Sequence, residues 1–211
     1  MVARELRLPV HARLGAVGPG SEGDLELAAV GLYRGVWGRI VRAYKEDPVP
    51  MVATVVLPRF HALARADGDR ALAEWAAEPV LVPVPMAKTR RRQRGFNPPE
   101  GLALELGAKL GWSCRPSALR RVRYRRPLRG LSETERRAEM AAAFQAGEIE
   151  ELAGRPVILI DDVVTTGSTL RAAAEALRRC GVPVVRAWCL GRTPRRHARR
   201  HASDRRSGAG D

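Results

Sequence analysis

The sequence has few cysteines, few aromatic residues and no long apolar run. Its three cysteines are odd in number and never form a C-x-x-C pair, which excludes a disulfide framework and a cysteine-based zinc site. No stretch approaches the roughly 18 apolar residues that a membrane-spanning helix needs, and no charged-then-apolar leader opens the sequence. We therefore expect a cytoplasmic protein without a membrane span.

Negative charge is also scarce, because 37 Lys and Arg residues outnumber 23 Asp and Glu residues and give a net charge of +14. The excess lies in two blocks, residues 86–137 and 191–211. Such blocks attract anions, which include phosphorylated small molecules, nucleic acid and acidic protein partners. The alternative is that the blocks reflect a general preference for arginine and form a solvated surface.

Apolar residues are abundant enough for one folded domain. They make up 45 % of the 211 residues, which excludes disorder throughout and allows the chain to bury a core. Apolar runs and turn residues divide the chain into parts. We expect a poorly ordered start over residues 1–24, a helical part over 25–78, a core over 79–193 and a basic, disordered tail over 194–211.

Short apolar runs alternate with amphipathic stretches. This pattern predicts an α/β fold with a parallel sheet flanked by helices, an N-terminal helical addition, and a ligand site at the carboxyl ends of the strands. We expect helices over residues 25–45, 52–77 (interrupted at 67–69), 98–110, 132–143 and 169–180, strands over 80–85, 118–124, 156–160 and 182–190, and a basic loop over 86–97.

One stretch carries the chemistry: residues 157–170, with the sequence VILIDDVVTTGSTL. Its apolar strand brings two carboxylates, Asp161 and Asp162, to the strand's carboxyl end. Residues 165–169 then turn into a helix, whose N-terminus offers free N–H groups and a positive dipole end that suit a phosphate monoester. Two carboxylates would repel a phosphate that they faced, but they can bind vicinal hydroxyls a few ångströms away from it. The pattern therefore predicts a phosphorylated sugar. The alternative is an ordinary strand–turn–helix with Asp as turn residues.

Residues 157–169 resemble the 5-phosphoribosyl-1-pyrophosphate (PRPP) binding motif of type I phosphoribosyltransferases, in which two acidic residues and a T-T-G-S-T turn follow an apolar strand. Further runs resemble the ComF family of phosphoribosyltransferase-like proteins, and the resemblance covers about residues 25–193. Many ComF-like proteins begin with a four-cysteine zinc-binding segment, which this sequence lacks. The runs are VPVP (82–85), RGFN (94–97), LSETER (131–136) and WCLGRT (188–193), with Phe144 and the stretch from Tyr33 to Lys45.

The resemblance implies a set of ligand-binding residues. Asp161 and Asp162 would bind the ribose 2′- and 3′-hydroxyls of PRPP. Lys88, Arg90 and Arg94 would face the pyrophosphate, from the loop that follows the first core strand. The 5′-phosphate would be held by Thr165, Thr166, Gly167, Ser168 and Thr169.

The same resemblance implies a cofactor and a lid. Mg²⁺ would be held mainly by the oxygens of PRPP, with no metal ligand from the protein, in keeping with the few protein ligands that magnesium usually takes. Residues 125–137 would form a mobile loop that covers the site and excludes water.

Three functions are compatible with these residues. The first is an enzyme that transfers the phosphoribosyl group to a nitrogen nucleophile with release of pyrophosphate. Thr165 stands where purine-type enzymes carry an acidic base, which argues against a purine acceptor, and no general base can be assigned. The second is a non-catalytic ComF-like module that supports DNA uptake, transformation or recombination through protein contacts. The third is a single-stranded DNA binder that uses residues 86–94 and 192–206, although no aromatic residues interleave with these basic runs.

Overall fold

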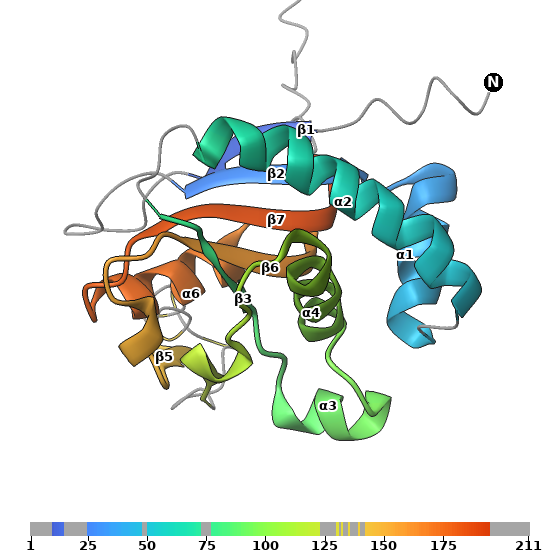
Figure 1. Ribbon diagram of the computed structural model, residues 1–211. Helices are drawn as coiled ribbons and strands as arrows, with labels where there is room; N and C mark the ends of the chain where they lie inside the picture. The colour runs from blue at the N-terminus through green and yellow to red at the C-terminus, as the bar shows by residue number, and fades with distance from the viewer. Residues whose placement is uncertain are drawn as a thin grey trace, which may run out of the picture.

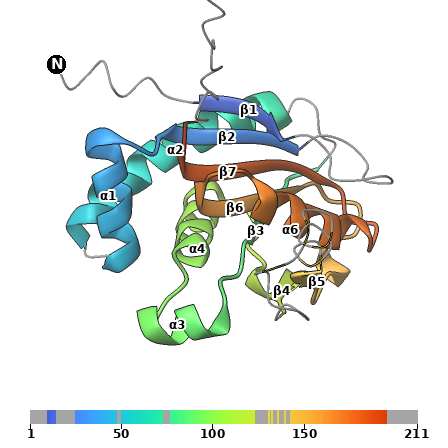
Figure 2. The same cartoon turned by 180° about the vertical axis from the view of Figure 1, so that it is seen from behind.

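The computed structural model describes residues 10–14, 25–47, 50–72, 77–122 and 142–194, together with residues 130, 132, 135 and 139. Its centre is a five-stranded sheet, in which four neighbouring strands run parallel and one outer strand is antiparallel (Figures 1 and 2). In sheet order, the strands are β1 (Val10–Leu14), β2 (Leu25–Leu32), β7 (Val184–Arg192), β6 (Val157–Val164) and β3 (Val80–Pro83).

Helices cover both faces of this sheet (Figures 1 and 2). One face packs against α1 (Gly35–Glu46), α2 (Pro50–Leu72) and α4 (Pro98–Leu110). The other face packs against α6 (Ser168–Arg178) and a small sheet of β4 (Leu119–Arg121) and β5 (Phe144–Ala146). The remaining elements are α3 (Lys88–Arg94), which lies between β3 and α4, and the 3-10 turns Pro116–Ala118 and Glu150–Leu152.

The central strand β6 is buried on both faces. Ile158 and Ile160 join the core under α1, α2 and α4, whereas Leu159 joins the core under α6. Successive side chains of a strand point to opposite faces. Asp161 therefore lies on the α6 side of the sheet and Asp162 on the α1 side.

The expectation of a helix over residues 25–45 is wrong for its first eight residues, which form β2. This strand pairs in parallel with β7, so it belongs to the same sheet as the core strands. Its side chains are buried on both faces, with Leu27 in one core and Ala28 in the other. Periodicity alone does not distinguish such a two-sided strand from a buried helix. The helix begins only at Gly35.

Three smaller expectations also differ from the structure. The segment over residues 1–24 contains β1, which pairs with β2. The basic loop contains the helix α3. The helix α2 runs unbroken through residues 67–69, because Asp67 is buried there and accepts hydrogen bonds from the side chains of Trp188 and Arg186. Local turn residues predicted an interruption that these tertiary contacts override.

Other local signals are confirmed. The helix over residues 98–110 ends at Gly111, which has a φ of 75°. Ser132 Oγ accepts a hydrogen bond from the amide of Glu135, and Glu135 Oε2 accepts one from the amide of Ser132, as in a capping box. Most of the helix expected beyond it, of the lid and of the basic tail lies outside the described residues. No described helix is both long and apolar enough to cross a membrane.

Candidate functional site

Two acidic residues near the carboxyl end of β6 leave the strand on opposite faces of the sheet, and their carboxyl groups still lie close enough to interact. Oδ1 of Asp161 accepts a hydrogen bond from the amide of Asp162 at 2.8 Å, and Oδ1 of Asp162 accepts one from the amide of Val163. These bonds hold each carboxylate beside the backbone. Both residues are half-buried, so a ligand at this end of the strand can reach them.

The turn between β6 and α6 is built from small and hydroxyl-bearing residues. Gly167 has a φ of 78°, a backbone conformation that favours glycine. The hydroxyls of Thr166 and Ser168 lie 3.0 Å apart. Arg171, one turn into α6, donates from Nη1 to the carbonyl of Thr166 at 3.0 Å. Arg171 thus braces the turn, a role that the sequence pattern did not reveal.

A hollow of about 30 Å³ lies between Asp161 and the turn. It has room for one water-sized group, so a larger ligand such as a phosphate would place one oxygen in it and extend outward. It brings Asp161 together with four of the five residues expected to hold a phosphate. The lining residues are Asp161, Val163, Val164, Thr165, Gly167, Ser168, Thr169 and Leu170.

Burial and the neighbouring carboxylate change the proton affinity of Asp161. Desolvation, followed by repulsion from Asp162, raises the pKa of Asp161 to about 8, although the hydrogen bond from the backbone and the charge of Lys45 act in the opposite direction. Near neutral pH the side chain of Asp161 therefore carries a proton for much of the time. The acidic pair then holds about one negative charge rather than two.

Lys45 brings α1 into the site. Its Nζ lies 3.0 Å from Oδ1 of Asp162, and both side chains are largely buried, with 21 % and 14 % of their surfaces exposed. The sequence resemblance included the stretch that ends at Lys45 but gave this residue no role. Lys45 and Asp162 are 117 positions apart in the chain, so no local sequence pattern predicts that they pair.

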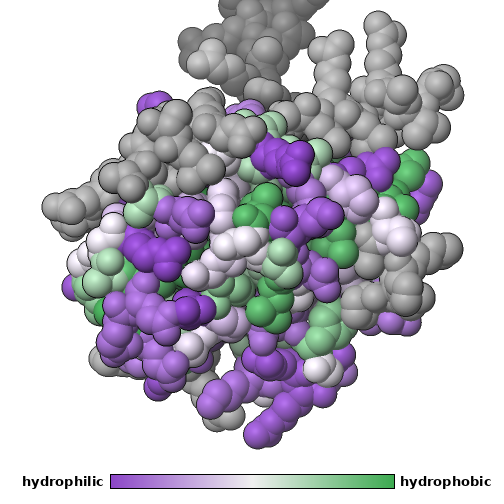
Figure 3. Space-filling model, viewed as in Figure 1, coloured by the Kyte–Doolittle hydropathy of each residue, from purple (hydrophilic) through white to green (hydrophobic). Residues whose placement is uncertain are grey.

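The three basic residues expected at the pyrophosphate lie on α3, apart from the hollow. Lys88 and Arg90 are exposed and Arg94 is half-buried, and α3 buries none of its side chains. Arg91 of this helix forms an ion pair with Glu100 of α4, at 3.2 Å. In Figures 1 and 2, α3 projects from the body of the protein, and Figure 3 shows hydrophilic side chains gathered at this lower edge.

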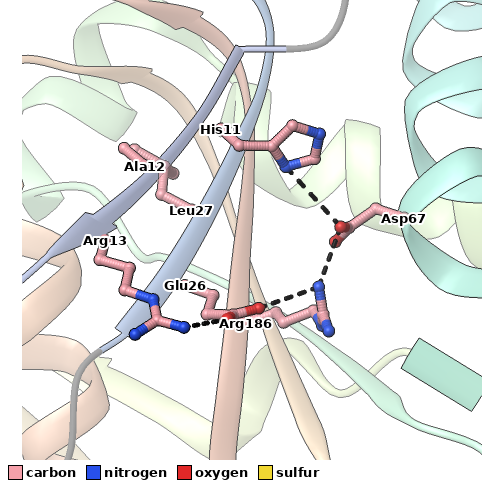
Figure 4. A pocket seen from close by; sticks show the side chains of 7 residues that line it. All are labelled: His11, Ala12, Arg13, Glu26, Leu27, Asp67 and Arg186. Carbon is pink, nitrogen blue, oxygen red and sulfur yellow. Dashed lines mark hydrogen bonds and ion pairs between the residues drawn. The ribbon is translucent and has the colours of Figure 1, made fainter. Parts of the chain in front are cut away.

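A second cavity, of about 290 Å³, lies between β1, β2, β7 and α2 (Figure 4). Arg186, which is buried, contacts Asp67 at 2.9 Å and Glu26 at 3.1 Å, and Trp188 Nε1 donates to Asp67 at 2.7 Å. Arg13 lies 3.7 Å from Glu26. These charges neutralise one another, so the cluster holds the outer strands and α2 to the sheet. It lies toward the amino ends of β2 and β7, away from the acidic pair.

Comparison with known proteins agrees with this geometry. The sequence profile of the phosphoribosyl transferase domain matches residues 93–207, which is more than half of the chain. The chain belongs to the phosphoribosyl transferase domain family. The mostly parallel sheet with helices on both faces confirms the type I phosphoribosyltransferase-like fold that the sequence predicted.

Curated relatives place the chain near ComF proteins within this family. It is 36 % identical over 113 residues to Competence protein F of Haemophilus influenzae, which covers 53 % of this chain and 49 % of that protein. It is 36 % identical over 113 residues to DNA utilization protein YhgH of Escherichia coli K12, covering 54 % and 49 %. Competence protein ComFC of Bacillus subtilis is 34 % identical over 102 residues, covering 48 % and 39 %. The chain thus matches about half or less of the length of each relative.

Proposed function

We propose that the protein binds PRPP at the carboxyl end of β6. The observation that carries this proposal is the hollow that joins Asp161 to the hydroxyl-bearing turn at the N-terminus of α6. A ligand that fits must present hydroxyl groups to carboxyl groups and a phosphate to a helix N-terminus. A ribose 5-phosphate unit has both parts, and the membership of the chain in the phosphoribosyl transferase domain family supports this choice.

Each half of the acidic pair has a distinct task in this proposal. Asp162, whose carboxylate lies 3.0 Å from Nζ of Lys45, accepts a hydrogen bond from one ribose hydroxyl. Asp161, whose pKa is raised, can accept from or donate to the second hydroxyl. A carboxyl pair with one net charge repels the nearby phosphate less than a doubly charged pair would.

The turn supplies the donors for the 5′-phosphate. The first N–H groups of α6 have no partner within the helix and, with the helix dipole, favour an anion. Thr165, Ser168 and Thr169 line the same hollow, and a hydroxyl group can donate to a phosphate oxygen. The pyrophosphate would be reached by Lys88, Arg90 and Arg94, if α3 approaches the site when the ligand binds.

The residues of the site are compatible with a Mg²⁺ ion that is held by the oxygens of the bound PRPP. Within the described part of the chain, no three His, Cys, Asp or Glu side chains gather into a metal site. Magnesium commonly keeps its waters and binds substrate phosphates with few protein ligands, so the oxygens of PRPP would hold it and no residue of this chain is assigned as its ligand. When bound, the ion would neutralise charge on the pyrophosphate.

The proposed reaction is transfer of the phosphoribosyl group. A nitrogen nucleophile forms a bond to C1 of the ribose, the bond from C1 to the pyrophosphate oxygen breaks, and pyrophosphate leaves with the electron pair. The protein contributes positioning and electrostatic stabilisation, through the acidic pair on the ribose and cations near the pyrophosphate. The hollow is lined at position 165 by a threonine, which has no carboxylate that could accept the proton of the nucleophile.

Calorimetric titration with PRPP, with and without Mg²⁺, tests the binding proposal. We expect heat from the unaltered protein and its loss in the double variant Asp161→Asn/Asp162→Asn. The matched control is Glu46→Gln/Asp47→Asn, which removes two exposed adjacent carboxylates near the C-terminal end of α1. Silence of the unaltered protein, or equal heat from the first double variant, would refute the assignment. Release of pyrophosphate with a panel of bases and amines then tests catalysis.

A second function is a binding module that takes part in DNA uptake. It is favoured by α3, a helix of sequence KTRRRQR with no buried side chain, and by the names of the relatives, which include competence and DNA utilization proteins. The partner would be single-stranded DNA or a protein of the same process. Binding to a fluorescent oligonucleotide that weakens steeply with salt supports DNA contact, and a flat response to salt contradicts it.

A further inference from the structure

Lys45 lies in the last turn of α1, and its position is fixed from two sides. Its Nζ lies 5.9 Å from the centre of the Tyr33 ring and 3.0 Å from Oδ1 of Asp162. Tyr33 packs closely on β7 at Gly191. A Cβ atom added to this glycine would lie only 3.1 Å from Tyr33 Cβ. The absence of a side chain at Gly191 therefore lets the ring lie against the end of the sheet, where it supports the lysine.

The ammonium acts mainly on one of the two carboxylates. Asp162 lies on the face of the sheet that packs against α1, whereas Asp161 lines the hollow on the face of α6. Lys45 therefore contacts Asp162 directly and reaches Asp161 only as a weaker charge effect that lowers the pKa of Asp161. The two acids, although adjacent in sequence, have different electrostatic surroundings.

Two other titratable groups near the acids, Tyr44 and Cys189, stay uncharged near neutral pH. Burial, with the charges of Glu105 and Asp162, raises the pKa of Tyr44 to about 12. Burial, with the charges of Asp161 and Asp162, raises the pKa of Cys189 on β7 well above its ordinary value. Arg192, also on β7, acts on Cys189 in the opposite direction. Within the described residues, the cation in direct contact with Asp162 comes from α1.

We propose that Lys45 is a positioning residue of the sugar-binding site: its ammonium holds the Asp162 carboxylate in place, ready to accept a hydrogen bond from a ribose hydroxyl. The inference rests on the proposed binding of PRPP and adds a residue that lies outside the segment matched by the family profile. Without the ammonium, the Asp162 carboxylate loses the contact that fixes its position and becomes a less well placed acceptor. The phosphate-binding turn, on the other face, keeps its own contacts.

The test compares ligands that use different parts of the site. In Lys45→Met, we expect the affinity for PRPP with Mg²⁺ to fall about tenfold, since one charged hydrogen-bond partner is weakened, while the affinity for inorganic phosphate stays unchanged. Lys45→Arg should stay within about threefold of the unaltered protein because it keeps the charge. The matched control, Arg42→Met, removes an exposed cation from the same helix and should leave both affinities unchanged.

A double-mutant cycle separates positioning from a general effect of charge. Lys45→Met should cost little further affinity for PRPP when Asp162 is already replaced by Asn, because the lysine acts through that carboxylate. In Lys45→Met alone, any pH dependence of PRPP affinity that reports Asp161 should move to higher pH, because the charge of Lys45 lowers the pKa of Asp161. If Lys45→Met does not fold, Lys45→Gln takes its place in the cycle.

The outcomes distinguish this inference from the function on which it rests. Absence of PRPP binding by the unaltered protein would overturn both. PRPP binding that is unchanged in Lys45→Met, or losses that simply add in the double-mutant cycle, would overturn the role of Lys45 and leave the proposed function intact. A parallel loss of PRPP and inorganic phosphate would show a merely structural role and also overturn the inference.

Discussion

Replacing Asp161 by Asn should stabilise the unliganded protein, by an amount that grows with pH. Burial and repulsion from Asp162 raise the pKa of Asp161 from 3.8 to about 8, so the folded state retains a proton that the unfolded chain releases near pH 4. The free energy of unfolding therefore falls as pH rises from about 4 to about 8 and then levels off. Asn keeps the size and the acceptor oxygen for the amide of Asp162 but has no charge to lose.

The expected gain follows from the size of the pKa change. Each pKa unit corresponds to about 1.4 kcal/mol, so a rise of roughly four units gives an upper limit of about 5 kcal/mol at pH 8. The acidic pair shares its charge and Lys45 offsets part of it, and we therefore expect a gain of about 2 kcal/mol at pH 8 and less than about 1 kcal/mol at pH 5.

Urea unfolding followed by circular dichroism at pH 5, 6, 7 and 8 measures this gain. The control is Asp47→Asn, which removes an exposed carboxylate and should shift stability equally little at every pH. A variant Asp161→Asn that is less stable than the unaltered protein at pH 8, or a difference that shrinks as pH rises, would refute the assignment of a raised pKa to Asp161.

Three further changes test other parts of the structure. Gly167→Ala should lower the free energy of unfolding by more than about 1 kcal/mol, because φ is positive there and an added Cβ would lie 2.7 Å from Leu14 Cδ2. It should also weaken binding of inorganic phosphate, and equal phosphate affinity would contradict the role of the turn. Asp67→Ala should lower the free energy of unfolding, measured by heat or urea, by about 3–5 kcal/mol, since it leaves the buried Arg186 without one carboxylate. Arg13→Ala removes one partner of an exposed pair and should lower it by less than about 1 kcal/mol. Equal losses of stability in the two variants would contradict the role of the buried ion pair. Lys88→Ala/Arg94→Ala should weaken PRPP binding but not phosphate binding, and an unchanged PRPP affinity would remove α3 from the site.

The strand–turn–helix around β6 was predictable because its signals are local. An apolar run, two acids and a turn of small residues occupy consecutive positions, and the alternation of side chains along a strand follows from backbone geometry alone. The same local logic gave the end of α4 at Gly111 and the capping box that begins at Ser132. The pairing of Asp161 with the turn follows directly from this arrangement.

The missed features depend on contacts between distant segments. The first strand of the parallel set, β2, looks helical in isolation, and its identity is decided by the hydrogen bonds that β7 offers. Lys45 and Arg171 are ordinary basic residues in amphipathic helices, and only the packing of α1 against the sheet or the course of the turn gives them partners. Asp67 looked like a helix breaker because the sequence does not show the buried arginine that it meets.

The position of β2 has a consequence for dissecting the protein. The segment that matches the family profile, residues 93–207, contains β6 and β7 but neither of the strands that flank them, since β3 and β2 lie earlier in the chain. Expressed alone, that segment would leave both of its long strands with a row of unsatisfied backbone groups, a template for association with other chains. The smallest part of the chain that can fold on its own is therefore larger than the segment that matches the family profile.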